Sequence, residues 1–233
     1  MSGGKAPGET ISAGVLDLFG LLAYAELVAF FRLSEDAALA SSLADKAALG
    51  EMAVAEFGHF RLLSERIARL NTSPEEAMSP FVAPLDAFHA RTAPADWLQG
   101  LVKAYVGDGF AADFYRAVAE LLDPESRALV LEVLADTGHA DFVVSRVRAA
   151  IAADPPLAGR LALWARRLVG EALAQAHRVA AERAPLAALL VSGDAARQGD
   201  IARMFAHLTD AHDQRMSALG LADWEKPPSG TAG

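Results

Sequence analysis

The sequence contains no cysteine among its 233 residues. Disulfides, iron–sulfur clusters and cysteine-ligated zinc are therefore excluded, and any bound metal must be held by carboxylate and imidazole side chains. Strand signals are also scarce, because alternating β-branched and aromatic runs joined by Asn-Gly or Asp-Gly hairpin turns are missing. Alanine dominates the 53% of residues that are hydrophobic, and it favours closely packed helices. The sequence therefore predicts an all-α protein.

Residues 1–8 also lack the features of a leader peptide. Residues 1–8 hold no charged segment followed closely by an apolar one, so we expect no signal peptide and a cytoplasmic protein. The run from Ala13 to Phe31 is apolar enough to raise the question of a membrane span. Asp17 and Glu26 interrupt it, and each acid would cost roughly 2.5–3.5 kcal/mol near a bilayer centre. A helix that is apolar on all sides also suits the middle of a bundle, so we expect no membrane partner.

Proline, glycine and polar clusters divide the chain into one helical domain at 10–222 and two disordered tails at 1–9 and 223–233. Residues 74–95 include Pro74, Pro80 and Pro84 and no long periodic stretch, so we expect them to form a crossover between the second and third helices. No linker separates two cores. The predicted helices cover residues 11–36, 47–70, 95–122, 124–153, 157–184 and 194–219.

Two carboxylate-x-x-His motifs lie inside apolar helical stretches. They are Glu56-Phe57-Gly58-His59 and Asp136-Thr137-Gly138-His139. A spacing of three brings both side chains to one face of a helix, one turn apart, so that a single helix can offer an oxygen and a nitrogen to one metal ion. One such motif often arises by chance, and the second copy strengthens the interpretation.

Two further carboxylates occupy matching positions on the other two helices. In an antiparallel helix pair, residues lie level when they are equally far from the turn. Glu26 and Glu56 are both about 15 residues from the first helix connection, and Asp108 and Asp136 are both about 14 residues from the turn between the third and fourth helices. Both pairs should then lie about 20 Å along their helices, near the middle of the bundle. The predicted metal ligands are Glu26, Glu56, His59, Asp108, Asp136 and His139.

This ligand set of four carboxylates and two imidazoles suits iron or manganese better than magnesium or calcium. The alternative interpretation is that the acids are surface residues or helix-end charges. Asp113 could accept the free ring N–H of His59 or His139, or be a plain surface acid. Tyr105 lies one turn before Asp108 and either lines the site or packs in the core. His177 either covers the open end of the site, as an extra ligand, or simply packs.

With these motifs the chain resembles the ferritin-like superfamily of di-iron proteins, and more closely the group related to the tRNA 2-methylthio-N6-isopentenyladenosine hydroxylase MiaE. The resemblance covers most of residues 10–220 and rests on the segments 23–27, 51–59, 105–115 and 134–139. It implies a ferritin-like antiparallel four-helix bundle with a long crossover between helices 2 and 3, plus two additional C-terminal helices. It also implies two iron ions, O₂ as co-substrate, an external electron donor and insertion of oxygen into a C–H bond. Aspartate at 108 and 136 replaces the commoner glutamate.

The net charge of −9 argues against a tRNA substrate, because nucleic-acid binding needs a surface that attracts phosphate. Residues 143–184 nevertheless hold seven arginines against three acids, which leaves an arginine-rich face open. Two other functions stay open as well. One is a ferroxidase or peroxide-consuming protein, with iron as substrate, and the other is a non-catalytic bundle whose polar core specifies its packing. We expect a homodimer, whereas cage storage of iron would need a large symmetric assembly.

Overall fold

The structure is a computed structural model that describes residues 11–135, 139–191 and 195–222, so the predicted tails lie outside it. Within these ranges every regular element is a helix, as predicted. In chain order the helices are α1 (Ala13–Leu39), α2 (Leu43–Arg69), α3 (Pro74–Arg91), α4 (Trp97–Val102), the π-helix η1 (Lys103–Asp108), α5 (Gly109–Ala119), α6 (Pro124–Val133), α7 (His139–Ala153), α8 (Leu157–Glu182), α9 (Ala184–Val191) and α10 (Ala195–Leu219).

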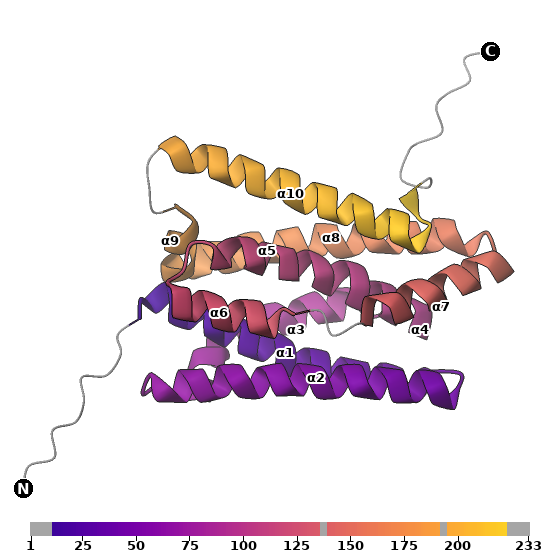
Figure 1. Ribbon diagram of the computed structural model, residues 1–233, viewed down its shortest axis with the longest axis horizontal. Helices are drawn as coiled ribbons and strands as arrows, with labels where there is room; N and C mark the ends of the chain where they lie inside the picture. Colours follow the sequence, from indigo (N-terminus) through magenta and orange to yellow (C-terminus); the bar gives the residue numbers. More distant parts are fainter. Residues whose placement is uncertain (1–10, 136–138, 192–194, 223–233) are drawn as a thin grey trace, which may run out of the picture.

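The first two helices form an antiparallel hairpin and lie side by side along the lower edge of the bundle (Figure 1). Ser12 begins α1 by accepting a hydrogen bond from the Val15 N–H at 3.3 Å. Ser42 begins α2 in the same way, accepting from the Asp45 N–H at 3.1 Å. Because α2 begins at Leu43, earlier than predicted, only residues 40–42 connect the two helices. Such a short connection fixes which residues of α1 and α2 lie level.

The predicted irregular crossover is an 18-residue helix, α3, so that expectation was wrong. Pro80 and Pro84 lie inside it, and each costs a helix roughly 3 kcal/mol in isolation. Packing offsets this cost, since Phe81 is fully buried. A Cβ atom on Gly20 of α1 would lie 2.1 Å from the Ala77 carbonyl oxygen of α3. The glycine therefore lets α3 lie directly on α1.

The third and fourth predicted helices are each divided. Residues 97–119 continue through α4, η1 and α5, with a π-helical stretch in the middle. The helix predicted at 124–153 ends at Val133 instead of running on, and Leu134 and Ala135 are not helical. The side chain of Arg116 donates to the Leu134 carbonyl oxygen, which satisfies an acceptor that the end of the helix leaves free.

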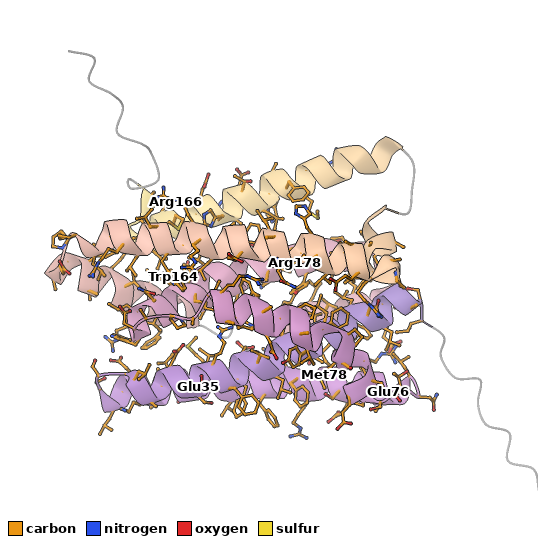
Figure 2. All side chains as sticks on the ribbon, turned by 180° about the vertical axis from the view of Figure 1, so that it is seen from behind. Glu35, Glu76, Met78, Trp164, Arg166 and Arg178 are labelled. Atoms are coloured by element: carbon orange, nitrogen blue, oxygen red, sulfur yellow. The ribbon has the colours of Figure 1, made fainter. Side chains whose placement is uncertain are left out.

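The C-terminal part holds three helices within the described residues, where two were predicted. The additional one, α9, follows α8 after Arg183, whose guanidinium pairs with Asp17 of α1. On α8 itself, Trp164 donates from Nε1 to the Gln99 carbonyl oxygen at 3.0 Å, and Arg178 donates to Gln175 Oε1 at 2.8 Å. Figure 2 labels Trp164 and Arg178 on this helix, and Figure 1 shows α10 lying over α8 and α5.

The α1 helix is long and apolar enough to cross a membrane, and in the described part of the chain it is the one helix that meets this test. Within its most apolar window, 56% of the residues are buried inside the protein. Its charged residues Asp17 and Glu26 are buried as well. The core helix of a bundle has the same composition, and α1 packs as one.

Within the described residues the core consists of three clusters of buried side chains, and the two larger ones lie toward opposite ends of the α1–α2 hairpin. One cluster takes residues 15–23 of α1 with Leu63 and Ile67 of α2. The other takes Leu33 of α1 with Leu49, Met52 and Ala53 of α2. Polar side chains of both helices fall between the two clusters, and this gap is where the carboxylate-x-x-His motif of α2 lies.

Candidate metal centre

Glu26, Glu56 and His59 converge in the gap between the two core clusters. One potential ligand atom from each lies within 4.8 Å of the other two. His59 Nδ1 is 3.4 Å from Glu26 Oε2 and 3.5 Å from Glu56 Oε2. The prediction that Glu26 and Glu56 lie level across the hairpin is confirmed, because the connection is centred where their spacing requires. The two helices therefore offer two oxygens and one nitrogen at one point.

The charge of this cluster is unbalanced without a cation. Burial raises the pKa of Glu26 well above its usual range, and the neighbouring Glu56 carboxylate raises it further. Interaction with the nearby Glu26 carboxylate, and then with that of Glu56, raises the pKa of His59 to about 9. Protons therefore compensate for the paired carboxylates in the metal-free protein. A divalent cation would take over this role and release protons, as metal binding to such ligands generally does.

The surroundings of the donor atoms fit a metal ion. Glu26 Oε2 and His59 Nδ1 are buried, and neither has a hydrogen-bond partner among the described residues. Buried polar atoms are normally satisfied, so a pair of orphaned atoms aimed at each other suggests a missing partner. Carboxylate oxygen and imidazole nitrogen together are the donor set for iron, manganese or zinc. No group of three histidines and acids elsewhere in the described ranges meets the same distance criterion.

Asp108 lines the same cavity as these three residues, but its carboxylate pairs with an arginine side chain of the protein. Arg32 of α1 donates from Nη2 to Asp108 Oδ2 at 3.2 Å. The Arg32 side chain is mostly buried, whereas 41% of the Asp108 side chain is exposed. Asp108 ends the π-helix η1, and π-helical turns are rare and occur frequently at functional sites. The extra residue in this turn changes the direction of Asp108 relative to a regular helix.

Other polar side chains surround the Arg32–Asp108 pair. Arg32 also donates from Nη1 to His89 Nδ1 at 3.2 Å, and Lys103 donates to the Thr92 carbonyl oxygen at 2.7 Å. Burial and the positive charges of Arg32 and Lys103 lower the pKa of His89 to about 2. Burial also lowers the pKa of Lys103 to about 7, with a further decrease from Arg32. His89 is therefore a neutral acceptor for Arg32 at physiological pH.

The remaining predicted residues have different places. Tyr105 and His177 both line the cavity next to the three clustered donors. Asp113 accepts hydrogen bonds from Arg116, at 2.9 Å, and from Arg215 of α10. Asp113 therefore pairs with two arginines. The predicted hydrogen bond from His59 to Asp113 is not among these contacts. Asp136 lies outside the described residues, as does the side chain of His139, so their predicted role as ligands stays a prediction.

The donors open onto a cavity of about 730 Å³ that is lined by residues of α1, α2, α3, η1, α5, α6, α7, α8, α9 and α10. This volume is in the range of small-molecule binding sites. Its walls are mainly leucine, alanine, valine and phenylalanine, among them Leu21, Phe114, Val179 and Leu208. The arrangement can therefore hold a metal ion beside a largely apolar space.

Three arginines of the cavity wall were missed from the sequence. Arg32 continues the lining stripe of α1 that contains Leu18, Ala25 and Ala29, at spacings of three, four and seven residues. That periodicity is a signal from which it could have been found. Arg116 pairs with Asp113 at a spacing of three on α5, which is a signal that the sequence does show. Arg215 reaches Asp113 across 102 residues of sequence, and no local pattern indicates that contact.

The comparisons with known proteins agree with this geometry. The family described as "Ferritin-like domain, actinomycetes" matches residues 9–193. A comparison with curated proteins gives no match. The matched segment contains all six predicted ligands and ends before α10. The helix that carries Arg215 therefore lies beyond the part of the chain that defines the family.

Proposed function

The chain belongs to the family of ferritin-like domains of actinomycetes, and we propose that it is a di-iron carboxylate oxygenase. In this proposal Glu26, Glu56 and His59 hold one metal ion, and Asp108, Asp136 and His139 complete the ligands for a second. The bound irons, or manganese in their place, would supply O₂ activation with electrons from an external donor. The observation that carries the proposal is the cluster of three donors that meet within 4.8 Å beside a large cavity.

The chain's own residues supply the rest of the site. The two core clusters flank the donors and exclude water from either side along the hairpin. Arg32 holds Asp108 through one hydrogen bond, and this contact must open before Asp108 can bind a second cation. Because an arginine and a divalent metal compete for the same carboxylate, the first site is expected to fill before the second.

Within this class, the resemblance to MiaE-type enzymes supports a hydroxylase that inserts oxygen into a C–H bond. A tRNA substrate is disfavoured by the net charge of −9. It is also disfavoured because arginines at 143–184 already contact other groups of the protein. Several of them are already engaged within the chain: Arg146 with Asp45, Arg148 with the Ala218 carbonyl oxygen, and Arg183 with Asp17. Because these arginines are already paired, we favour a small organic substrate in the cavity over a tRNA.

The apolar cavity also favours an oxygenase over a ferroxidase or peroxide-consuming protein, since iron as a substrate needs no organic pocket. A non-catalytic bundle would not explain why Glu26 Oε2 and His59 Nδ1 are buried without hydrogen-bond partners among the described residues. We include a homodimer in the proposal, and its mass in solution distinguishes it from a storage shell.

Metal analysis of the purified protein after reconstitution with Fe²⁺ tests the proposal. We expect two irons per chain on a small oligomer, and loss of most bound iron in Glu56→Gln and His59→Ala. Glu51→Gln is the matched control, because Glu51 is an exposed carboxylate on the same helix. Crystals of the loaded protein should scatter anomalously at the iron edge beside Glu26.

The same measurement separates the alternatives. Many irons on a large shell would support storage, and no iron in any preparation would support the scaffold. Equal iron in wild type and in His59→Ala would contradict the assignment of the cluster. O₂ consumption by the loaded protein with a chemical reductant then tests the oxygenase itself.

A further inference from the structure

Arg215 of α10 offers a hydrogen-bond donor that the described part of the protein does not use. Its Nη2 donates to the Gly109 carbonyl oxygen at 3.0 Å and to Asp113. Its Nη1 is buried and has no hydrogen-bond partner within the described residues. The side chain is only 14% exposed and lines the cavity. A buried guanidinium nitrogen without an acceptor is costly, so a missing acceptor is expected at this point.

The charges around Arg215 define what kind of acceptor fits. Arg116 and Arg215 both contact Asp113, so two positive charges share one negative charge. The surplus of one positive charge matches a monoanion. A carboxylate carries this single negative charge, and its two oxygens match the planar donors of a guanidinium.

The apolar wall defines the remainder of the ligand. On α10, Met204 and Leu208 line the cavity on the same face as Arg215, 11 and 7 residues before it. At 1.5 Å per residue the apolar face extends about 16 Å from the guanidinium. Helices α8 and α9 add Val179 and Leu186 to this wall. The space beside the arginine is therefore long and apolar, and a short polar acid would leave most of it unfilled.

We propose that the cavity binds a long-chain monocarboxylate, with its carboxylate on Arg215 and its alkyl chain along α10 and α8. This inference rests on the proposed function in one respect, namely that such an acid is the substrate class of the metal centre. Binding itself requires only the cavity and Arg215. The carboxylate group is anchored beside Gly109, which follows the proposed ligand Asp108, so the chain of the acid shares the cavity with the metal donors.

Calorimetric titration of the full chain with palmitate, below its aggregation concentration, tests the inference. We expect one palmitate per chain, and about tenfold weaker binding in Arg215→Gln, since a hydrogen bond to a charged group is lost. Arg203→Gln is the matched control, because it removes an exposed arginine from the same helix. Hexadecanol, which has the same tail without the charge, should bind more weakly to wild type and equally to wild type and Arg215→Gln.

A second pair of variants examines the tail independently. Ala180→Phe fills the cavity wall on α8 and should shift the preference from palmitate toward decanoate, whereas Ala174→Phe, an exposed position on the same helix, should not. Equal affinity for palmitate and hexadecanol, equal weakening by the Arg215 and Arg203 variants, or binding of tRNA in place of palmitate would each overturn the inference.

The titration is done on metal-free and on iron-loaded protein, so that two failures can be told apart. Palmitate binding without any iron uptake would leave the binding site standing and refute the proposed function. Two irons per chain without palmitate binding would support the metal centre and overturn the ligand. Arg215→Gln is accepted for comparison only if its circular dichroism and melting temperature match those of Arg203→Gln, and otherwise the Ala180 pair decides.

Discussion

Arg32 Nη2 lies 3.2 Å from Asp108 Oδ2, so that one carboxylate of the predicted ligand set is already paired with a guanidinium. The pair joins α1 to the π-helix η1 across 76 residues of sequence. It places a positive charge in the cavity where the predicted ligand set would place a metal ion. The strength of this contact therefore controls how readily Asp108 can become a ligand.

Removing Arg32 should strengthen binding of the second metal ion. Arg32→Gln frees Asp108 and withdraws a cation from the cavity, and we expect the affinity for a second equivalent of Mn²⁺ or Co²⁺ to rise about tenfold. Arg61→Gln is the control, because Arg61 forms an exposed pair with Glu65 on α2. Metal titration followed by electronic spectroscopy gives both affinities. An unchanged second affinity would show that Asp108 is not a ligand.

Buried His89 should make the protein less stable in mild acid. Its native pKa of about 2 lies below the ordinary value of 6.5, because burial, Arg32 and Lys103 all oppose protonation. Below pH 6.5 the unfolded chain therefore binds a proton that the native state refuses, and stability is lost as pH falls. Above pH 6.5 both states are neutral and this contribution vanishes. From pH 6.5 to 5 the loss should reach up to about 2 kcal/mol.

Urea unfolding at several pH values measures this dependence. His89→Asn should flatten the decrease between pH 6.5 and 5, whereas His207→Asn, at an exposed position on α10, should keep it. Lys103, whose native pKa is about 7, contributes in a separate window between pH 7 and 10.5, where stability rises with pH. The windows of His89 and Lys103 do not overlap, but His59, whose native pKa is about 9, lowers stability as pH rises from 6.5 to 9 and so opposes Lys103 there. A wild-type slope that persists in His89→Asn would refute the role of this histidine.

The contact between α1 and α3 can be tested with two glycines. Gly20→Ala would place its Cβ 2.1 Å from the Ala77 carbonyl oxygen, so the helices must separate. We expect a loss of at least about 2 kcal/mol in the free energy of unfolding. Gly50→Ala, on α2 with nothing within 4 Å of the added Cβ, should instead gain about 0.5–1 kcal/mol from helix propensity. Similar effects of both substitutions would mean that α3 does not pack on α1 as described.

Metal binding should raise the melting temperature of the protein. At a free Mn²⁺ concentration 100 times the dissociation constant, the native state gains about 2.7 kcal/mol. Chelation with EDTA should reverse the increase. Glu26→Gln should abolish it, since Glu26 supplies a buried oxygen of the cluster, while Glu51→Gln should retain it. An increase of the same size in Glu26→Gln would place the stabilising metal elsewhere.

The half of the site that spans α1 and α2 could be predicted from the sequence. Glu26 and Glu56 are equally far from a short connection, and both helices are regular between these residues and that connection. Counting residues therefore gives their relative height directly. The all-helical fold could also be predicted, because apolar periodicity, alanine content and the missing strand signals agree with one another.

The other half could not be placed by the same counting. The π-helical turn at Lys103–Asp108 adds a residue to the register, and α6 ends at Val133 before it reaches Asp136. Both effects depend on tertiary contacts, such as the Arg116 side chain on the Leu134 carbonyl oxygen, that no local pattern reveals. In the same way the prolines of α3 concealed a helix that is stabilised by burial of Phe81.

The position of α10 has a consequence for how this protein and its relatives can diverge. The helix supplies Met204, Leu208 and Arg215 to the cavity, yet no donor of the Glu26–Glu56–His59 cluster comes from it. In the proposed function, exchanging this one segment would alter which molecules are admitted while the hairpin of Glu26, Glu56 and His59 keeps its three donors. The proposed reactivity and selectivity would then be encoded in separate stretches of the chain.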